Sequence, residues 1–185
     1  MLPRLFMGEE RIARKYLPEF VYGGIDGAVT TFAVVAGSIG AALSPAIVLI
    51  LGFANLFADG FSMAVSNYLA TKSQTELHRH HVDYKEYVRL GKHPVKTAIA
   101  TFISFFIIGF IPLLSFLLSF FYPSLKNSQI MISFVLTGAA LALVGAVKGE
   151  VTQKHWMRSA AETLLIGGVA ALLAFIVGAL LKGIM

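Results

Sequence analysis

Residues 98–121 read AIATFISFFIIGFIPLLSFLLSFF, an apolar stretch that contains no charged side chain. A helix of about 20 apolar residues is long enough to cross the hydrocarbon core of a bilayer, which is about 30 Å thick. The stretch therefore predicts a membrane-spanning helix over 95–121. Pro112 is a candidate kink, because proline removes a helical hydrogen bond. The aromatic and aliphatic composition predicts that this helix is a wall facing lipid.

Apolar stretches of similar length recur along the chain. Of the 185 residues, 57% are hydrophobic and only 14% are charged, whereas about 25% of a soluble domain is charged. The sequence therefore predicts an all-α integral membrane protein with five transmembrane helices. The four further predicted spans are 20–43, 45–70, 129–148 and 160–181.

Little of the chain remains outside these spans. Residues 1–19 mix charged and apolar side chains, which is typical of an amphipathic segment in the membrane interface and not of a secretory signal. Residues 20–185 then form one five-helix transmembrane domain with a short cytoplasmic loop at 72–94. The chain has no cysteine, which excludes thiolate metal ligands and disulfides.

Lys and Arg residues are distributed unevenly about the predicted membrane. Thirteen of the 15 precede the first span or lie in the second and fourth connections, and only Lys126 and Lys182 lie on the other side. The positive-inside rule places the N-terminus in the cytoplasm and the C-terminus outside or in a lumen. A net charge of +5 can also indicate nucleic-acid binding. The one-sided distribution favours membrane orientation instead, so no nucleic-acid partner is expected.

Two carboxylates lie within predicted spans, Asp26 in the first and Asp59 in the second. An ionised side chain inside a membrane costs about 3 kcal/mol or more, so such residues usually face a cavity or a partner. No Lys or Arg lies within these two spans, which argues against a buried salt bridge. Capping of a broken helix stays open, because a glycine follows each aspartate. We expect a functional role for the pair.

The second span carries a stripe of possible ligands. Asn55, Asp59 and Met63 are four residues apart in succession, so they share one helix face. Carboxylate and amide oxygens suit divalent cations, and a thioether shifts the preference toward softer transition metals. The alternative for Met63 is a gap-filling side chain in an apolar core.

The hydrophilic connection holds candidate ion-collecting residues. His78 and His81 are three apart and could bind a metal together on a helix, although no third ligand is defined. The alternative is a solvated basic loop near anionic lipid. The residues that could collect ions at an entrance are Glu76, His78, His81, Glu86 and Glu150.

No pattern of an enzyme is found. The chain has no glycine-rich phosphate loop and no paired serine and histidine within a span. Two membrane aspartates can share a proton in an intramembrane protease, but the sequence settings of such sites are absent. The protein is therefore not expected to be an enzyme or to need a cofactor.

Small residues in the first span predict close helix packing. Gly23 and Gly27 are four apart, as are Ala36 and Gly40. Small residues at this spacing let helix backbones approach each other. We expect this helix to lie against other helices or against its own copy.

Three segments resemble the vacuolar iron transporter family. YGGIDGAVTTFAVVAG (22–37) and GFANLFADGFSMAVSNYLATKS (52–73) resemble its first two helices, and residues 145–178 are similar to its closing region. The two Asp-Gly pairs and the ADGxSM stretch carry most of the resemblance.

The resemblance implies a five-helix homodimer with a metal path between its subunits. It implies export of Fe2+, or the related Mn2+, from the cytosol in exchange for protons. Asp26 and Met63 match the intramembrane metal-path residues of the family, and Asp59 and Asn55 fall in the same motif as supporting positions. The expected partners are the lipid bilayer, divalent metal ions, protons and a second copy.

The chain departs from many members of that family in one respect. Those members carry a glutamate-rich metal-binding domain between helices two and three, and the loop at 72–94 is too short for it. The short His- and Glu-containing segment either substitutes for it weakly, or substrate handling differs. Small size and the lack of a targeting segment favour a prokaryotic plasma membrane over a vacuolar membrane. Two alternatives stay open: a metal sensor or scaffold without flux, and a channel without proton coupling.

Overall fold

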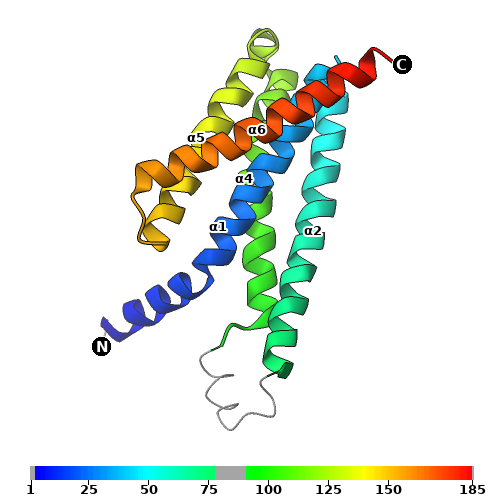
Figure 1. The fold of residues 1–185 in the computed structure, drawn as a ribbon. Coiled ribbons are helices and arrows are strands. Elements are labelled where there is room, and N and C mark those ends of the chain that lie inside the picture. The colour runs from blue at the N-terminus through cyan, green and yellow to red at the C-terminus, as the bar shows by residue number, and fades with distance from the viewer. Residues whose placement is uncertain (1–2, 78–90, 185) are drawn as a thin grey trace.

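The structure, a computed structural model, describes residues 3–77 and 91–184 and consists of long helices (Figure 1). Each of the five long helices contains a stretch long and apolar enough to cross a membrane; in the first helix this stretch is Lys15–Gly40. The predicted all-α fold with five spans is therefore confirmed. The elements are α1 (Pro3–Gly40), α2 (Pro45–Leu77), α4 (Pro94–Phe121), the short 3-10 helix η2 (Pro123–Leu125), α5 (Gln129–Val151) and α6 (Trp156–Lys182).

The turn between α1 and α2 is short. α1 ends at Gly40, three residues before the predicted end, because the chain turns there. Ala42 has a φ of 55°, and the N–H groups of Ala42 and Leu43 donate back to carbonyls of the last turn of α1 at 2.9 Å. Such bonds close a helix C-terminus. Only residues 41–44 connect the two helices, and the other four helices contain their predicted spans.

α4 is the central helix of the bundle, so the prediction of a lipid-facing wall was wrong for most of its surface. It packs against α1, α2 and α5, and Phe105 and Leu113 are fully buried. One narrow stripe, which includes Ile99 and Ile103, remains exposed. Hydroxyl groups at helical spacing mark the packed face, and most of them bond back to α4 carbonyls. These buried polar residues are Thr97, Thr101, Ser104, Ser115 and Ser119.

Glycines set the helix crossings of α1. A Cβ atom added at Gly27 would lie 2.9 Å from the Phe105 carbonyl carbon of α4, and one added at Gly40 would collide with the Phe175 carbonyl oxygen of α6. At Gly23 the added atom would lie 2.6 Å from the Thr101 carbonyl oxygen. The prediction that α1 packs closely against other helices is therefore confirmed.

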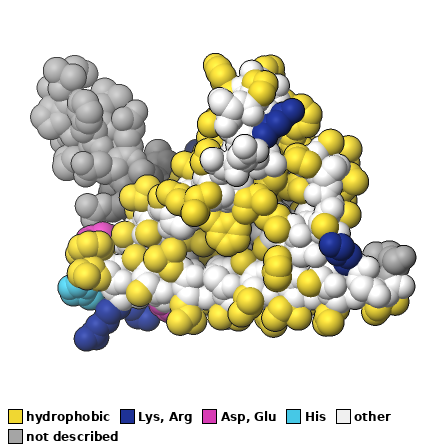
Figure 2. Space-filling view, turned by 90° about the horizontal axis from the view of Figure 1, so that it is seen from above, with side chains coloured by type: hydrophobic (Ala, Val, Ile, Leu, Met, Phe, Trp, Pro, Cys, Tyr) yellow, Lys and Arg dark blue, Asp and Glu magenta, His cyan; other side chains and the backbone are white. Residues whose placement is uncertain are grey.

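The outer surface of the bundle is apolar. Seen from above, it is dominated by hydrophobic side chains, with basic and acidic ones at a few places (Figure 2). The marked N and C ends lie at opposite ends of the bundle, as an odd number of spans requires (Figure 1). We call the end that holds the C-terminus, the α1–α2 turn and η2 the C-terminal end. Which side of the membrane it faces stays a prediction from the Lys and Arg distribution.

Candidate metal site in the membrane

The two intramembrane carboxylates lie at one depth. Asp26 is fourteen residues before the end of α1, and Asp59 is fourteen residues after the start of α2. A rise of 1.5 Å per residue puts both about 21 Å from the connecting turn, well within a hydrocarbon core of about 30 Å. Both side chains are partly buried, and their charges are close enough to interact. The short turn therefore brings the two predicted site residues to one level.

Asn55 links α2 to α1 one helical turn from this pair. Its Nδ2 lies 3.4 Å from the Thr30 Oγ1 and 3.5 Å from the Thr31 Oγ1, and it donates to both hydroxyls. The Thr30 hydroxyl in turn donates to the Asp26 backbone carbonyl at 2.8 Å. Neither threonine is among the residues predicted from sequence, although Thr30 lies one helical turn from Asp26. In this structure Asn55 acts as a helix link beside the carboxylates.

Met63 packs against the apolar core. It is partly buried and lies against the cluster that contains Leu56 and Phe105. This environment agrees with a gap-filling methionine, because the flexible thioether adapts to irregular core gaps. The role of its sulfur as a ligand stays a prediction.

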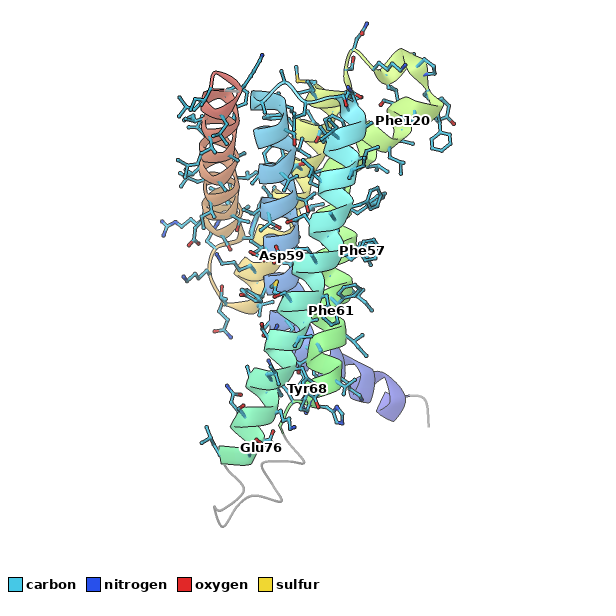
Figure 3. The ribbon with its side chains drawn as sticks, turned by 90° about the vertical axis from the view of Figure 1, so that its right-hand side faces the viewer. Phe57, Asp59, Phe61, Tyr68, Glu76 and Phe120 are labelled. Carbon is cyan, nitrogen blue, oxygen red and sulfur yellow. The ribbon has the colours of Figure 1, made fainter. Side chains whose placement is uncertain are left out.

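The side of α2 that carries Asp59 and the opposite side of the helix carry side chains of different kinds. Phe57 and Phe61 lie about 200° around the helix from Asp59, and Figure 3 shows them on the side away from it. Both are more than half exposed, as side chains facing lipid would be. Beside the Asn55–Asp59–Met63 stripe runs a row of small exposed residues, Ala54, Ala58, Ser62 and Ser66.

The predicted entrance residues do not join the carboxylate pair. Glu76 lies near the end of α2, about 26 Å along the helix from Asp59, and pairs with Lys72 at 3.9 Å (Figure 3). Glu150 is exposed near the end of α5. The other three, His78, His81 and Glu86, lie outside the residues that the structure describes. Within 3–77 and 91–184, no group of three His, Asp or Glu side chains could hold a metal ion in one chain.

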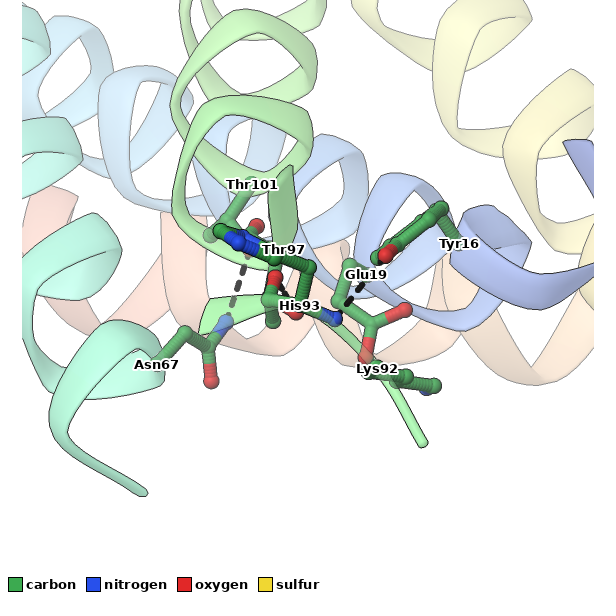
Figure 4. A network of polar contacts seen from close by, with 7 residues as sticks. All are labelled: Tyr16, Glu19, Asn67, Lys92, His93, Thr97 and Thr101. Atoms are coloured by element: carbon green, nitrogen blue, oxygen red, sulfur yellow. Dashed lines mark hydrogen bonds and ion pairs between the residues drawn. The ribbon is translucent and has the colours of Figure 1, made fainter. Parts of the chain in front are cut away.

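A polar network ties α1 to the start of α4 at the other end of the bundle (Figure 4). The His93 N–H donates to the Tyr16 hydroxyl at 2.9 Å, and the Lys92 ammonium pairs with the Glu19 carboxylate. The Glu19 side chain is only 13% exposed, and its Oε2 has no partner among the described residues. Within 3–77 and 91–184, Lys92 is the cation that pairs with this nearly buried charge.

The same network reaches α2 through Asn67. Its Nδ2 donates to the Thr101 hydroxyl at 2.7 Å, and that hydroxyl donates to the Thr97 carbonyl at 2.9 Å (Figure 4). Asn67 therefore joins α2 to α4, whereas Asn55 joins α2 to α1. Both links involve residues more than 20 positions apart, so helical spacing along the sequence could not reveal them.

Replacing Lys92 with Met is expected to destabilise the protein by about 1–3 kcal/mol, because the Glu19 carboxylate then lacks its cation. Lys92 itself is 36% exposed, which keeps the effect below that of a fully buried pair. Thermal unfolding in detergent should show a Tm lower by about 2–4 °C for each kcal/mol. The double variant Glu19→Gln/Lys92→Met should recover most of the loss. The control Lys96→Met removes an exposed lysine and should leave Tm unchanged; an equal loss there would contradict the assignment.

Five apolar helices that hold two carboxylates at one depth define a polytopic membrane protein with an ionisable site inside the membrane. A family model described as the VIT family matches residues 17–90 and 79–179. The chain belongs to the VIT family.

Curated relatives align over most of the chain. It is 26% identical to a vacuolar iron transporter of Plasmodium berghei, over 91% of this chain and 83% of that protein. It is 27% identical to vacuolar iron transporter 1 of Arabidopsis thaliana, over 88% and 85% of the two chains. A further relative of 25% identity is membrane protein of ER body 2 of Arabidopsis thaliana, which aligns over 95% of this chain and 33% of its own length.

The alignments also bear on the connection between α2 and α4. The alignment to the Plasmodium berghei protein extends over 227 positions, more than the 185 residues of this chain, so that relative carries segments that this chain lacks. The two parts of the family match overlap at residues 79–90, inside this connection. The absence of the glutamate-rich domain from this chain stays a prediction.

Proposed function

We propose that this protein exports a divalent transition metal, Fe2+ or Mn2+, from the cytosol in exchange for protons. The observation that carries the proposal is the pair Asp26 and Asp59, which lies at one depth inside the membrane with both side chains partly accessible. Two relatives named vacuolar iron transporter support the substrate class.

The carboxylates supply what a dication needs inside a membrane. A bare ion in hydrocarbon is prohibitively unfavourable, so the path must offer anionic oxygens in place of water. Carboxylates that lie close to one another repel, so a neutralising cation or proton stabilises them. Protons and metal would then compete for the same oxygens. This competition is the minimum requirement for exchange transport.

A second copy of the chain would complete the site. The described residues of one chain hold two carboxylates but no group of three metal-binding side chains. The row of small exposed residues on α2 lies beside Asp59 and would let a second α2 approach closely. In such a homodimer, two Asp26 carboxylates and two Met63 thioethers face one path. Glu76 and Glu150 would meet the metal first, at the cytosolic mouth.

The distribution of Lys and Arg and the names of the relatives support a proposal for the membrane and the orientation of this dimer. The excess of Lys and Arg supports a cytosolic position for the end with Glu76. The names of the relatives support a vacuolar membrane, and a plasma membrane is the alternative. In either case the metal would leave the cytosol.

Flux measurements on proteoliposomes test the proposal. We expect wild-type protein to move protons down an imposed pH gradient and to move Fe2+ or Mn2+ in the opposite direction, recorded with a pH dye and a metal-quenched dye together. Metal flux without proton movement would make the protein a channel. No flux for either metal, with metal binding retained, would favour a sensor or scaffold.

A further inference from the structure

Two apolar grooves lie beside α4, toward the end of the bundle opposite the C-terminal end. The first groove lies between α2 and α4, has a volume of about 500 Å3, and has a lining that includes Phe61, Tyr68 and Ile99. The second groove lies between α1 and α4, has a volume of about 310 Å3, and has a lining that includes Tyr16 and Ala100. Both volumes are within the range of about 300–1,000 Å3 that bound small molecules occupy.

The two grooves adjoin along one exposed stripe of α4. Ile99 lines the first groove, and the next residue, Ala100, lines the second. Ile99 and Ile103 are 51% and 47% exposed, as side chains that face lipid would be. The grooves therefore have room for two hydrocarbon chains, one on each side of this stripe.

Two lysines lie at one level beyond the grooves. The hydrogen bond from Asn67 to Thr101 shows which residues of α2 and α4 lie at the same depth. Lys72 is five residues after Asn67 toward the end of α2, and Lys96 is five residues before Thr101 toward the start of α4. A rise of 1.5 Å per residue puts each lysine about 7.5 Å from that bond in the same direction.

Each lysine neighbours the lining of a groove on its own helix. Lys72 is four residues after Tyr68, and Lys96 is three residues before Ile99 and four before Ala100. Residues three or four apart are neighbours on a helix surface. Lys72 and Lys96 therefore flank the first groove from its two helices, and Lys96 also lies beyond the second groove.

The polar groups at this level are available to an anion. Lys96 is exposed, and Lys72 is 51% exposed and forms only an exposed pair with Glu76 at 3.9 Å. Such a pair is weak because water screens it, so the Lys72 ammonium can turn to another anion. The Tyr16 hydroxyl accepts a hydrogen bond from the His93 N–H at 2.9 Å and can still donate its own hydrogen.

We propose that the two grooves and the two lysines bind one phospholipid of net negative charge. Its phosphate lies between Lys72 and Lys96, and one hydrocarbon chain lies in each groove. The match is one of charge, because this end carries the excess of Lys and Arg and the cytoplasmic leaflet carries the anionic lipids. Phe61 lies on the side of α2 away from Asp59 (Figure 3), so the lipid leaves the carboxylates free.

Native mass spectrometry of the full chain in detergent tests this site. Phosphatidylglycerol and phosphatidylcholine with identical hydrocarbon chains are added in turn. We expect wild type to hold phosphatidylglycerol about 25-fold more tightly, because each lysine near a negative lipid contributes about 5-fold. Lys72→Ala and Lys96→Ala should each lower the affinity for phosphatidylglycerol about 5-fold and leave that for phosphatidylcholine unchanged. Equal retention of the two lipids by wild type would overturn the proposal.

Lys154→Ala is the matched control. Lys154 is also an exposed lysine, but it lies in the connection between α5 and α6, away from both grooves. This variant should bind phosphatidylglycerol as wild type does, and a 5-fold loss there would show that any surface charge has the same effect, against the proposal. All three lysine variants should keep the wild-type Tm after delipidation, because each removes an exposed side chain.

Lysophosphatidylglycerol, which has the same headgroup and one hydrocarbon chain, tests the grooves. We expect it to bind about 10-fold more weakly than phosphatidylglycerol, because one groove loses its apolar contacts. Equal affinity, or equal stabilisation of the protein by glycerol 3-phosphate, would show that the headgroup alone is recognised and would overturn the proposal. Lysine variants that change the number of subunits but not the bound lipid would show a second copy of the chain on this face, with the same consequence.

Discussion

Asp26→Asn is expected to lower proton-driven metal flux about 100-fold or more. Asparagine keeps the size of the side chain and one carbonyl oxygen but removes the negative charge that replaces the hydration of a dication. A loss of about 3 kcal/mol at the rate-limiting barrier corresponds to roughly a 100-fold change in rate. The measurement is initial Fe2+ and Mn2+ uptake into proteoliposomes at a fixed pH gradient.

The control for this variant removes a carboxylate elsewhere. Glu162 lies in α6 and pairs with Lys148 at 3.2 Å, and its side chain is half exposed. Glu162→Gln should therefore transport at the wild-type rate. Both variants should elute as one species and unfold at the wild-type Tm. Undiminished proton-coupled transport by Asp26→Asn would remove Asp26 from the metal path.

Gly27→Ala is expected to prevent α1 from packing on α4. The added Cβ would lie 2.9 Å from both the carbonyl carbon and the Cα of Phe105 and would collide with the carbonyl oxygen. These are backbone atoms, so they cannot rotate away as a flexible side chain would. Gly109 faces the same crossing, where an added Cβ would lie 2.7 Å from the Gly27 carbonyl oxygen. We expect a loss of about 3 kcal/mol or more.

Thermal unfolding and gel filtration in detergent check this prediction. Gly168→Ala in α6 is the matched control, because an added Cβ there meets nothing within 4 Å. Alanine also has the better helix propensity by about 1 kcal/mol, so this control should be neutral or stabilising. A Gly27→Ala protein that keeps the wild-type Tm would show that the α1–α4 crossing tolerates a wider separation.

The sequence could predict the spans because each one is a long apolar run between charged or proline-containing turns. It also located Asp26 and Asp59, because a charge inside an apolar run is conspicuous. Their common depth was within reach too, since it follows from equal distances to one turn. The prediction that α4 faces lipid was wrong because it relied on the aromatic composition of the helix. Gly109 and the regularly spaced hydroxyl groups, which mark a packed face, were given too little weight.

Other features depend on contacts that sequence patterns do not encode. Glu19 and Lys92 are 73 positions apart, and both are charged residues of ordinary appearance near predicted span ends. Asn67 and Thr101 are 34 positions apart, and their hydrogen bond forms only because α2 packs beside α4.

The turn of residues 41–44 limits how α1 and α2 can move relative to each other. A four-residue connection prevents the helices from sliding past one another, but it permits a rotation about the turn that separates their far ends. Separation grows with distance from the pivot, so a rotation of about 10° moves groups about 21 Å away, such as Asp26 and Asp59, apart by about 4 Å. Asn55 lies nearer the turn, and its hydrogen bonds to Thr30 and Thr31 oppose this separation of the helices.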